Sequence, residues 1–153
     1  MDELELLDEI KDLVKLIDNK GFTARNLKES DWDTLVGWWD WWRWKVIPKD
    51  FLPENGTGGI MVSKDNIGIV AGFLYATNSK VMILDFVVSN PEYKKKDRKA
   101  AIELLIKEAE SKAKKSGYKY MFSVGRSTHL IDIHKKLGWL VDNKHSYEII
   151  KNL

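Results

Sequence analysis

A cluster of cations at residues 94–99 has residue types that could bind an anionic group. In the stretch 92–99 five cations stand against two acids, which leaves a net charge of +3 (five minus two): Lys94, Lys95, Lys96, Arg98 and Lys99, with Glu92 and Asp97. A helical pattern starts in the same stretch, and a cation at a helix N-terminus opposes the helix dipole by about 0.3 kcal/mol or more. Because a helix start also offers free N–H groups, the cluster predicts an anion-binding site. A solvated helix surface is the alternative interpretation.

A single carboxylate lies inside an apolar run. Asp85 interrupts the stretch Val81–Val88, which otherwise has the composition of a strand buried on both faces. Because an unpaired charge is costly to bury, Asp85 must be partnered, protonated or placed at an opening in the sheet. Two interpretations follow. Asp85 is either a general base that accepts a proton or a structural acid that is paired elsewhere.

His134 is a second residue whose type can take part in chemistry, because histidine changes its charge near neutral pH. The alternative is a histidine at a helix end that packs over the following strand. With His129 and His145 it makes no spacing typical of a metal site, so we expect no metal. The chain has no cysteine, which excludes disulfides, thiolate catalysis and Cys-ligated zinc.

Six of the seven tryptophans lie between Trp32 and Trp44. On a helical wheel Leu35, Trp38, Trp39 and Trp42 share one face, which we expect to belong to the core. Trp41 and Trp44 fall roughly opposite. They are therefore candidates for contact with a substrate or a partner, unless the helix is buried on both sides.

The elements that must position these residues follow from hydrophobic periodicity and turn signals. Helices are predicted at 2–18, 31–45, 94–116 and 128–137. Strands are predicted at 22–27, 60–63, 67–77, 81–88, 118–124, 139–141 and 147–150. The strands at 60–63 and 67–77 form a hairpin, and the last two strands enclose a turn at residues 142–145. This order predicts an α/β fold, with one mixed and mostly antiparallel sheet flanked by helices.

Two stretches resemble the GNAT superfamily of acyl-CoA-dependent N-acyltransferases. The first is Val87-Val88-Ser89-Asn90-Pro91-Glu92-Tyr93-Lys94, which is similar to the family's apolar strand and its Pro-Glu-Tyr-Arg element before a long helix. The second is His134-Lys135-Lys136-Leu137-Gly138-Trp139, which looks like the family's Tyr-x-Lys-Leu-Gly-Phe element. The resemblance runs from Phe22 to the end of the chain. The Trp-rich segment also resembles phage-encoded members.

The resemblance implies an N-acetyltransferase that moves an acetyl group from acetyl-CoA, its co-substrate, to a primary amine of a small molecule or a protein. It implies that the main chain at Phe86, Val87 and Val88 holds the thioester and that residues 94–99 hold the CoA phosphates. Asp85 would then be the general base, and His134 would protonate the leaving thiolate. Ser127 stands where the family often has an asparagine that contacts the cofactor.

The sequence departs from the family at the phosphate-binding turn. Asp97 and Lys99 fill the two positions where the family has Gly and Gly or Ala. Glycine serves such turns because the backbone must approach a pyrophosphate closely. The departure supports an alternative, a GNAT-fold binding module that no longer catalyses and uses the Trp-rich helix as its contact surface. A nucleic-acid binder is a third possibility, and the net charge of +2 disfavours it.

The remaining expectations concern the whole chain of 153 residues. We expect one domain at 21–153, preceded by an amphipathic helical extension at 1–20. The extension carries seven acids by residue 18, and we expect it to dock on the basic helix of its own domain or to form a homodimer with a second copy. No signal peptide or membrane span is visible, so no membrane partner and a cytoplasmic location are expected.

Overall fold

The computed structural model describes residues 2–45, 47–142, 144 and 146–153. Its helices and strands occur in the order α1 (Glu3–Asp18), β1 (Thr23–Asn26), α2 (Trp32–Trp41), β2 (Gly59–Lys64), β3 (Ile67–Ala76), β4 (Val81–Ser89), α3 (Arg98–Lys115), β5 (Tyr120–Ser123) and α4 (Thr128–Lys136). Short 3-10 turns occur at Glu29–Asp31, Lys49–Phe51 and Pro53–Gly56. Within these ranges no helix is long and apolar enough to span a membrane.

The strands form one mixed sheet in the order β1-β2-β3-β4-β5. All neighbours are antiparallel except β4 and β5, which are parallel. Asp65 and Asn66 join β2 to β3, and both take a left-handed conformation with φ of 51° and 63°. A two-residue turn of this kind matches the twist of a hairpin. The predicted hairpin and α/β class are therefore confirmed.

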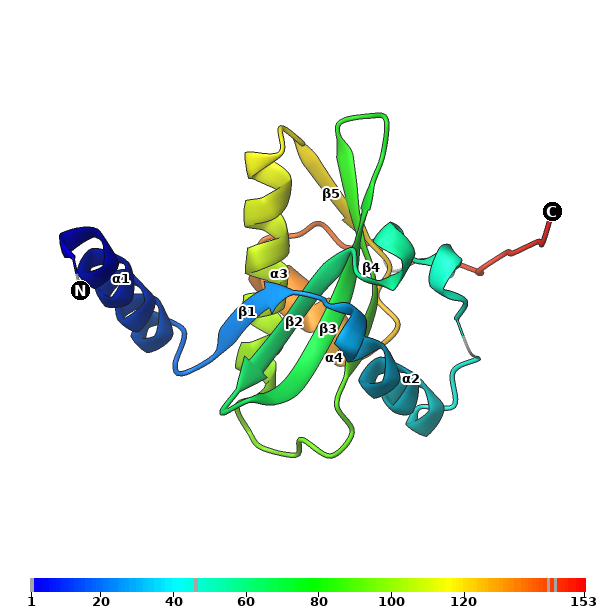
Figure 1. The fold of residues 1–153 in the computed structure, drawn as a ribbon. Helices are drawn as coiled ribbons and strands as arrows, with labels where there is room; N and C mark the ends of the chain where they lie inside the picture. Colours follow the sequence, from blue (N-terminus) through cyan, green and yellow to red (C-terminus); the bar gives the residue numbers. More distant parts are fainter. Residues whose placement is uncertain (1, 46, 143, 145) are drawn as a thin grey trace.

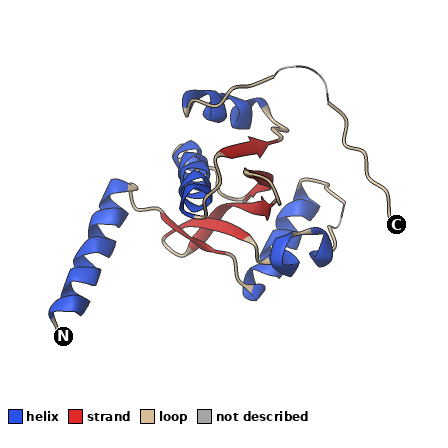
Figure 2. Ribbon diagram, turned by 90° about the horizontal axis from the view of Figure 1, so that it is seen from above, coloured by secondary structure: helices blue, strands red, loops and turns tan. Residues whose placement is uncertain are grey.

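Helices cover both faces of the sheet, and a separate apolar core fills each interface (Figure 2). The core of one face lies under α3 and α4 and includes the fully buried Leu84 and Leu105. The core of the other face lies under α2 and includes Trp38, Trp39 and Phe73. A Cβ at Gly72 would lie 3.1 Å from Leu84 and 3.3 Å from Leu105, so this glycine lets α3 pack closely on the sheet.

Helix α1 projects away from this domain (Figure 1). Asp2 caps it by accepting a hydrogen bond of 2.8 Å from the Glu5 N–H. The helix has no buried residue. One ion pair ties its side chains to the domain, in which Lys15 Nζ lies 4.0 Å from Glu108 Oε1. The predicted helix is thus present, but it does not dock on the basic helix α3.

The two strands predicted at 139–141 and 147–150 are wrong. The described residues of both ranges form no strand, and Asn143 and His145 of the predicted turn lie outside the described residues. Leu140 and Ile149 are fully or almost fully exposed. An alternating pattern selects a strand only where one face is buried and a neighbouring strand pairs with its backbone. Trp139 packs on the core, but no neighbouring strand pairs with the described residues of either range, and residues 147–150 are all exposed.

Two helix boundaries also differ from the prediction. Helix α2 ends at Trp41 instead of residue 45, because Arg43 takes a left-handed conformation with φ of 60°. Trp42 therefore leaves the helical wheel and is 40% exposed, although the wheel placed it in the core. Helix α3 begins at Arg98, so Lys94–Lys96 lie in the turn before it instead of in its first turn.

Candidate functional site

The parallel strands β4 and β5 diverge halfway along β4. Their ladder ends where Leu84 pairs with Ser123, while β4 continues to Ser89. At the point of divergence Phe86 takes a left-handed φ of 52°, and the register between β3 and β4 shifts. A left-handed residue other than glycine costs about 1–2 kcal/mol. The bulge therefore depends on its surroundings, and it leaves the β4 edge at Phe86, Val87 and Val88 without a β5 neighbour.

Asp85 lies at this bulge and is paired. The register places it opposite Phe73, on the face covered by α2. Its Oδ1 accepts a hydrogen bond of 2.7 Å from the Phe86 N–H and one of 2.6 Å from Arg126 Nη1. Asp85 is thus partnered, which is one of the three states expected for a carboxylate in an apolar strand. Its Oδ2 has no hydrogen-bond partner among the described residues.

Arg126 is a site residue that the sequence analysis missed. It follows β5 and extends across the opening to Asp85, and its Nε donates a hydrogen bond of 2.7 Å to Glu148 Oε1. Its guanidinium also lies 5.1 Å from the centre of the Phe86 ring. Two features of the sequence could have predicted this pair. Asp85 lies in an apolar strand and needs a partner, and Arg126 is a cation that follows the end of the next strand.

An aromatic cluster surrounds Phe86 on the same face. The Phe86 ring lies 5.7 Å from Phe51 and 6.4 Å from Tyr75. The Tyr75 hydroxyl donates a hydrogen bond of 3.0 Å to the Phe51 carbonyl, and burial raises the pKa of Tyr75 to about 12. The half-buried Trp44 packs on the same core as Tyr75 and Phe86. Of the two predicted contact tryptophans, Trp44 is therefore the one that belongs to the same cluster as Phe86.

Trp41 lies on the surface, where it is 58% exposed and packs edge-to-face on Trp42 at 4.7 Å. Trp42 is fixed by its indole N–H, which donates a hydrogen bond of 2.9 Å to the Ser89 carbonyl. The pair thus marks the end of β4, just before the cationic turn.

The turn at residues 94–99 presents its cations outward. Lys94, Lys95, Lys96 and Lys99 are exposed, and no side chain caps the start of α3. Asp97 instead bonds to groups beside the turn. It lies 3.0 Å from Lys64 Nζ on β2 and accepts a hydrogen bond of 2.8 Å from the Tyr93 hydroxyl. The bond from Lys64, followed by that from Tyr93, lowers the pKa of Asp97. Lys64 thus offsets the negative charge that would oppose an anion.

His134 lies on the other side of β4, on helix α4. It is only 5% exposed, its Nδ1 lies 2.7 Å from the Leu130 carbonyl, and its ring packs edge-to-face on Trp139 at 4.6 Å. The carbonyl assigns the proton to Nδ1, which leaves Nε2 buried and without a hydrogen-bond partner in the described chain. Ser123 Oγ, where the β4–β5 ladder ends, is a second such atom.

Ser127 has a structural contact. Its hydroxyl accepts a hydrogen bond of 3.2 Å from the Leu130 N–H and caps α4. A hydroxyl can accept a second hydrogen bond, so the cap does not use up its capacity.

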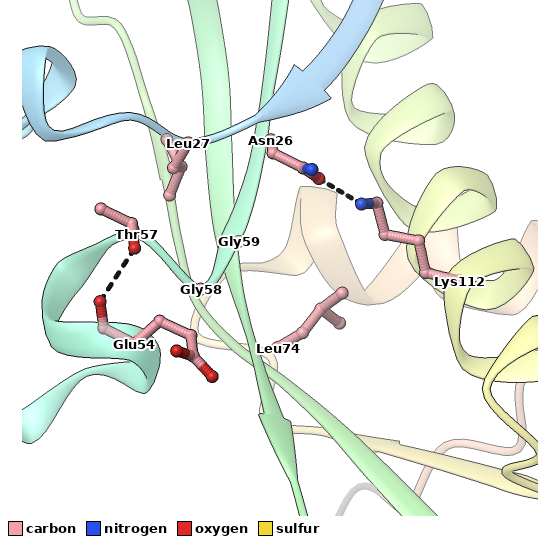
Figure 3. Close-up of a pocket in the computed structure, with 8 residues that line it drawn as sticks. All are labelled: Asn26, Leu27, Glu54, Thr57, Gly58, Gly59, Leu74 and Lys112. Carbon is pink, nitrogen blue, oxygen red and sulfur yellow. Dashed lines mark hydrogen bonds between the residues drawn. The ribbon is translucent and has the colours of Figure 1, made fainter.

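Two cavities lie outside the opening. One of about 380 Å³ is bordered by Gly59, Leu74 and Lys112 (Figure 3). Glu54 and Lys112 place opposite charges on its walls, and Lys112 is hydrogen-bonded to Asn26. Because β2 runs from Gly59 here to Lys64 at the cationic turn, the cavity lies at the opposite end of the sheet from that turn. The second, of about 250 Å³, lies between α3 and α4 with Lys99 in its wall.

By sequence the chain matches no family model and no curated protein significantly. By structure it is similar to solved acetyltransferases. An aminoglycoside N-acetyltransferase in complex with CoA is 15% identical, with a TM-score of 0.58, and the match covers 86% of this chain and 95% of that one. A Trypanosoma brucei acetyltransferase is 14% identical, with a TM-score of 0.58, over 86% of this chain and 99% of that one.

A third similar structure is an aminoglycoside acetyltransferase from an uncultured soil metagenomic sample in complex with sisomicin. It is 10% identical, with a TM-score of 0.57, over 87% of this chain and 99% of that one. These likenesses show that the chain has the fold of the GNAT acetyltransferases.

Proposed function

We propose that this protein transfers an acetyl group from acetyl-CoA to a primary amine. The observation that carries the proposal is the opening between β4 and β5, which starts at the Phe86 bulge and ends at the cationic turn before α3. The shared fold supports it, since one similar structure was solved with CoA and another with sisomicin. The residue types also fit the co-substrate, because the turn before α3 carries exposed cations that suit its phosphates.

The phosphate end of the co-substrate is assigned to residues 94–99. Lys94, Lys95 and Lys96 supply positive charge to a pyrophosphate, and the uncapped first turn of α3 supplies N–H groups. Asp97 replaces a glycine of the family's turn, but its contacts with Lys64 and Tyr93 brace the turn against the sheet. The turn thus keeps its cationic character without the glycine.

The reacting groups are assigned to the bulge. The open edge of β4 at Val87 and Val88 would align the thioester by backbone hydrogen bonds, which makes proximity the main catalytic effect. The amine would approach from the face of Tyr75 and Phe86, where Asp85 accepts its proton through water at Oδ2. As the C–N bond forms, the C–S bond breaks and the sulfur takes a proton.

His134 is assigned to that last proton transfer from the opposite side of β4. Because Nδ1 is held by the Leu130 carbonyl, the available atom is Nε2. It donates a proton only when the ring is charged, so the assignment requires an imidazolium at that moment. Asp85 and His134 lie on opposite faces of the sheet.

The acceptor class follows from the same cluster. Asp85, Glu148 and Arg126 sum to a charge of −1 beside exposed and half-buried aromatic rings (two acids, one cation). A cationic amine attached to a small molecule or a peptide would be attracted to this surface. Trp44 and the exposed Trp41 are proposed to border it.

The test is a titration of the full chain with acetyl-CoA, followed by detection of free CoA thiol with a panel of amines. Micromolar binding and amine-dependent thiol release are expected. Binding without release for any amine would favour the alternative function, a binding module that no longer catalyses, for which Arg126 across the opening is the favouring observation. Absence of binding would contradict the proposed transferase and would be compatible only with the binding module, whose contact surface is the Trp-rich helix.

A further inference from the structure

Helix α1 presents an apolar face that the domain does not cover. The helix has 16 residues, and its large apolar side chains are between 37% and 75% exposed. They are Leu4, Leu6, Leu7, Ile10, Leu13, Val14, Leu16 and Ile17. At 100° per residue, four of them fall within an arc of about 60°. These four, Leu6, Ile10, Leu13 and Ile17, are called the α1 seam below.

The total surface of the chain indicates that something covers this seam. The chain exposes 11000 Å². A compact monomer of 17.7 kDa exposes about 7,900 Å². The excess is about 3,000 Å², and the exposed apolar side chains of α1 contribute to it, whereas a specific interface buries only about 800 Å² on each partner. A helix of this length is also marginal by itself in water.

We propose that α1 pairs with α1 of a second copy of this chain, antiparallel across a two-fold axis. In this arrangement Leu6 lies opposite Ile17 of the other copy, and Ile10 lies opposite Leu13. Every contact in the seam then joins a leucine to an isoleucine over a length of about 17 Å (11 steps of 1.5 Å). The seam alternates in steps of four and three residues, which is the spacing of helices that pack side by side. This proposal is independent of the proposed function.

The charges of α1 select the antiparallel direction. Residues 2–10 carry five acids and no base, whereas residues 11–20 carry three lysines and two acids. An antiparallel pair therefore sets a half of charge −5 against a half of charge +1 (three minus two). A parallel pair would set −5 against −5. The antiparallel direction also opposes the two helix dipoles favourably and sends the two domains to opposite ends of the pair.

Other ways to cover the seam agree less well with the structure. Its own domain offers one ion pair, between Lys15 and Glu108 at the 4.0 Å limit. An anionic lipid surface would repel a helix in which seven acids outnumber two lysines by residue 18. A second copy supplies both an apolar seam of equal length and the complementary charge.

The first experiment is analytical ultracentrifugation of the full chain and of two variants. The chain itself is expected to sediment as a dimer at concentrations of tens of micromolar. Ile10→Glu/Leu13→Glu changes the seam and should give a monomer. Leu4→Glu is the matched control, because Leu4 is 73% exposed and lies off the seam, and it should remain dimeric. Tryptophan fluorescence checks that the domain stays folded in each variant. A monomeric full chain, or a dimeric seam variant, would overturn the proposal.

The second experiment fixes the direction and uses the absence of native cysteine. Leu6→Cys and Ile17→Cys chains are made separately, one with a size tag, and are oxidised alone and mixed. The antiparallel pair predicts a disulfide only in the mixture, between the tagged and the untagged chain. A disulfide formed by either variant alone indicates a parallel pair and overturns the proposal, as does the absence of any cross-link.

Discussion

At the scale of the residue, Asp31 joins β1 to the start of α2. Its two carboxylate oxygens each accept a hydrogen bond of 2.8 Å from the Arg25 guanidinium, and Oδ2 also accepts one of 2.8 Å from the Lys28 N–H. The bond from Arg25 is the main cause that holds the pKa of Asp31 below its ordinary value. The pair therefore fixes the approach to the Trp-rich helix, which borders the candidate site.

Asp31→Asn should lower the free energy of unfolding by about 2 kcal/mol at pH 7, because it weakens a charged hydrogen-bonded pair. Since the pKa of Asp31 is depressed in the folded state, the pair contributes fully to stability above the pKa of an unfolded aspartate, about 3.9. This contribution is lost as the pH falls through the pKa of Asp31 in the folded state. Urea unfolding between about pH 7 and pH 3 measures the free energy of unfolding of the native chain and of the variant. The difference between the two should narrow only below about pH 4. Asp33→Asn, at an exposed position, is the control and should have little effect at any pH.

Asp85→Asn tests proton transfer at the bulge. If Asp85 is the general base, turnover should fall by about 10²–10⁴-fold, while the dissociation constant of acetyl-CoA stays unchanged. Glu148→Gln removes the other carboxylate on Arg126 and should change turnover little. Equal losses in both variants would show that Asp85 acts only by holding Arg126.

At the scale of the element, substitutions that change only charge can test whether the turn before α3 binds the co-substrate. Lys94→Glu/Lys95→Glu/Lys96→Glu replaces three exposed cations by anions next to the helix start. The affinity for acetyl-CoA should fall by at least about tenfold, because several weak exposed contacts become repulsive together. Calorimetric titration measures the affinity, and the remaining binding should depend less on salt.

Lys114→Glu/Lys115→Glu/Lys119→Glu is the matched control for the turn. These lysines are also exposed, but Lys114 and Lys115 end α3 and Lys119 lies in the connection between α3 and β5. The same change of charge should leave the affinity for acetyl-CoA within about twofold and cost some stability, because cations at a helix C-terminus are favourable. If both triple variants bind alike, net charge determines affinity and the turn is not the site.

Elements with a local signal could be predicted from the sequence, and those that depend on distant contacts could not. Asp65-Asn66 marks the hairpin, and Gly117 stops the pattern of α3 with a φ of 86°. The end of α2 at Trp41 has no such mark, because Arg43 is not a residue type that favours a left-handed conformation. Asp85 was recognised as needing a partner, but its identity depends on how β4 and β5 lie side by side. The strands predicted after Gly138 do not form, because no neighbouring strand pairs with them among the described residues. An alternating sequence pattern does not show whether such a neighbour exists.

At the scale of the whole molecule, the chain divides into a packed domain and two exposed ends. Trp139 is tied to α3 by an indole hydrogen bond of 2.8 Å to Glu110, whereas the exposed side chains of Leu140, Ile149 and Leu153 follow it. At the other end α1 has no buried residue. Within one chain, packing on the domain therefore does not stabilise α1. Under the pairing proposed above, a second copy stabilises this helix against opening.

Amide hydrogen exchange should show this division directly. The amides of α1 should exchange fast in dilute protein, because an isolated helix of this length opens readily, and their protection should rise with concentration as copies pair. The amides of α3, which is packed on the sheet, should be protected equally at every concentration. In the Ile10→Glu/Leu13→Glu variant α1 should stay unprotected throughout, while α3 is unchanged. Protection of α1 in dilute protein that equals that of α3 would instead mean that α1 docks on its own domain.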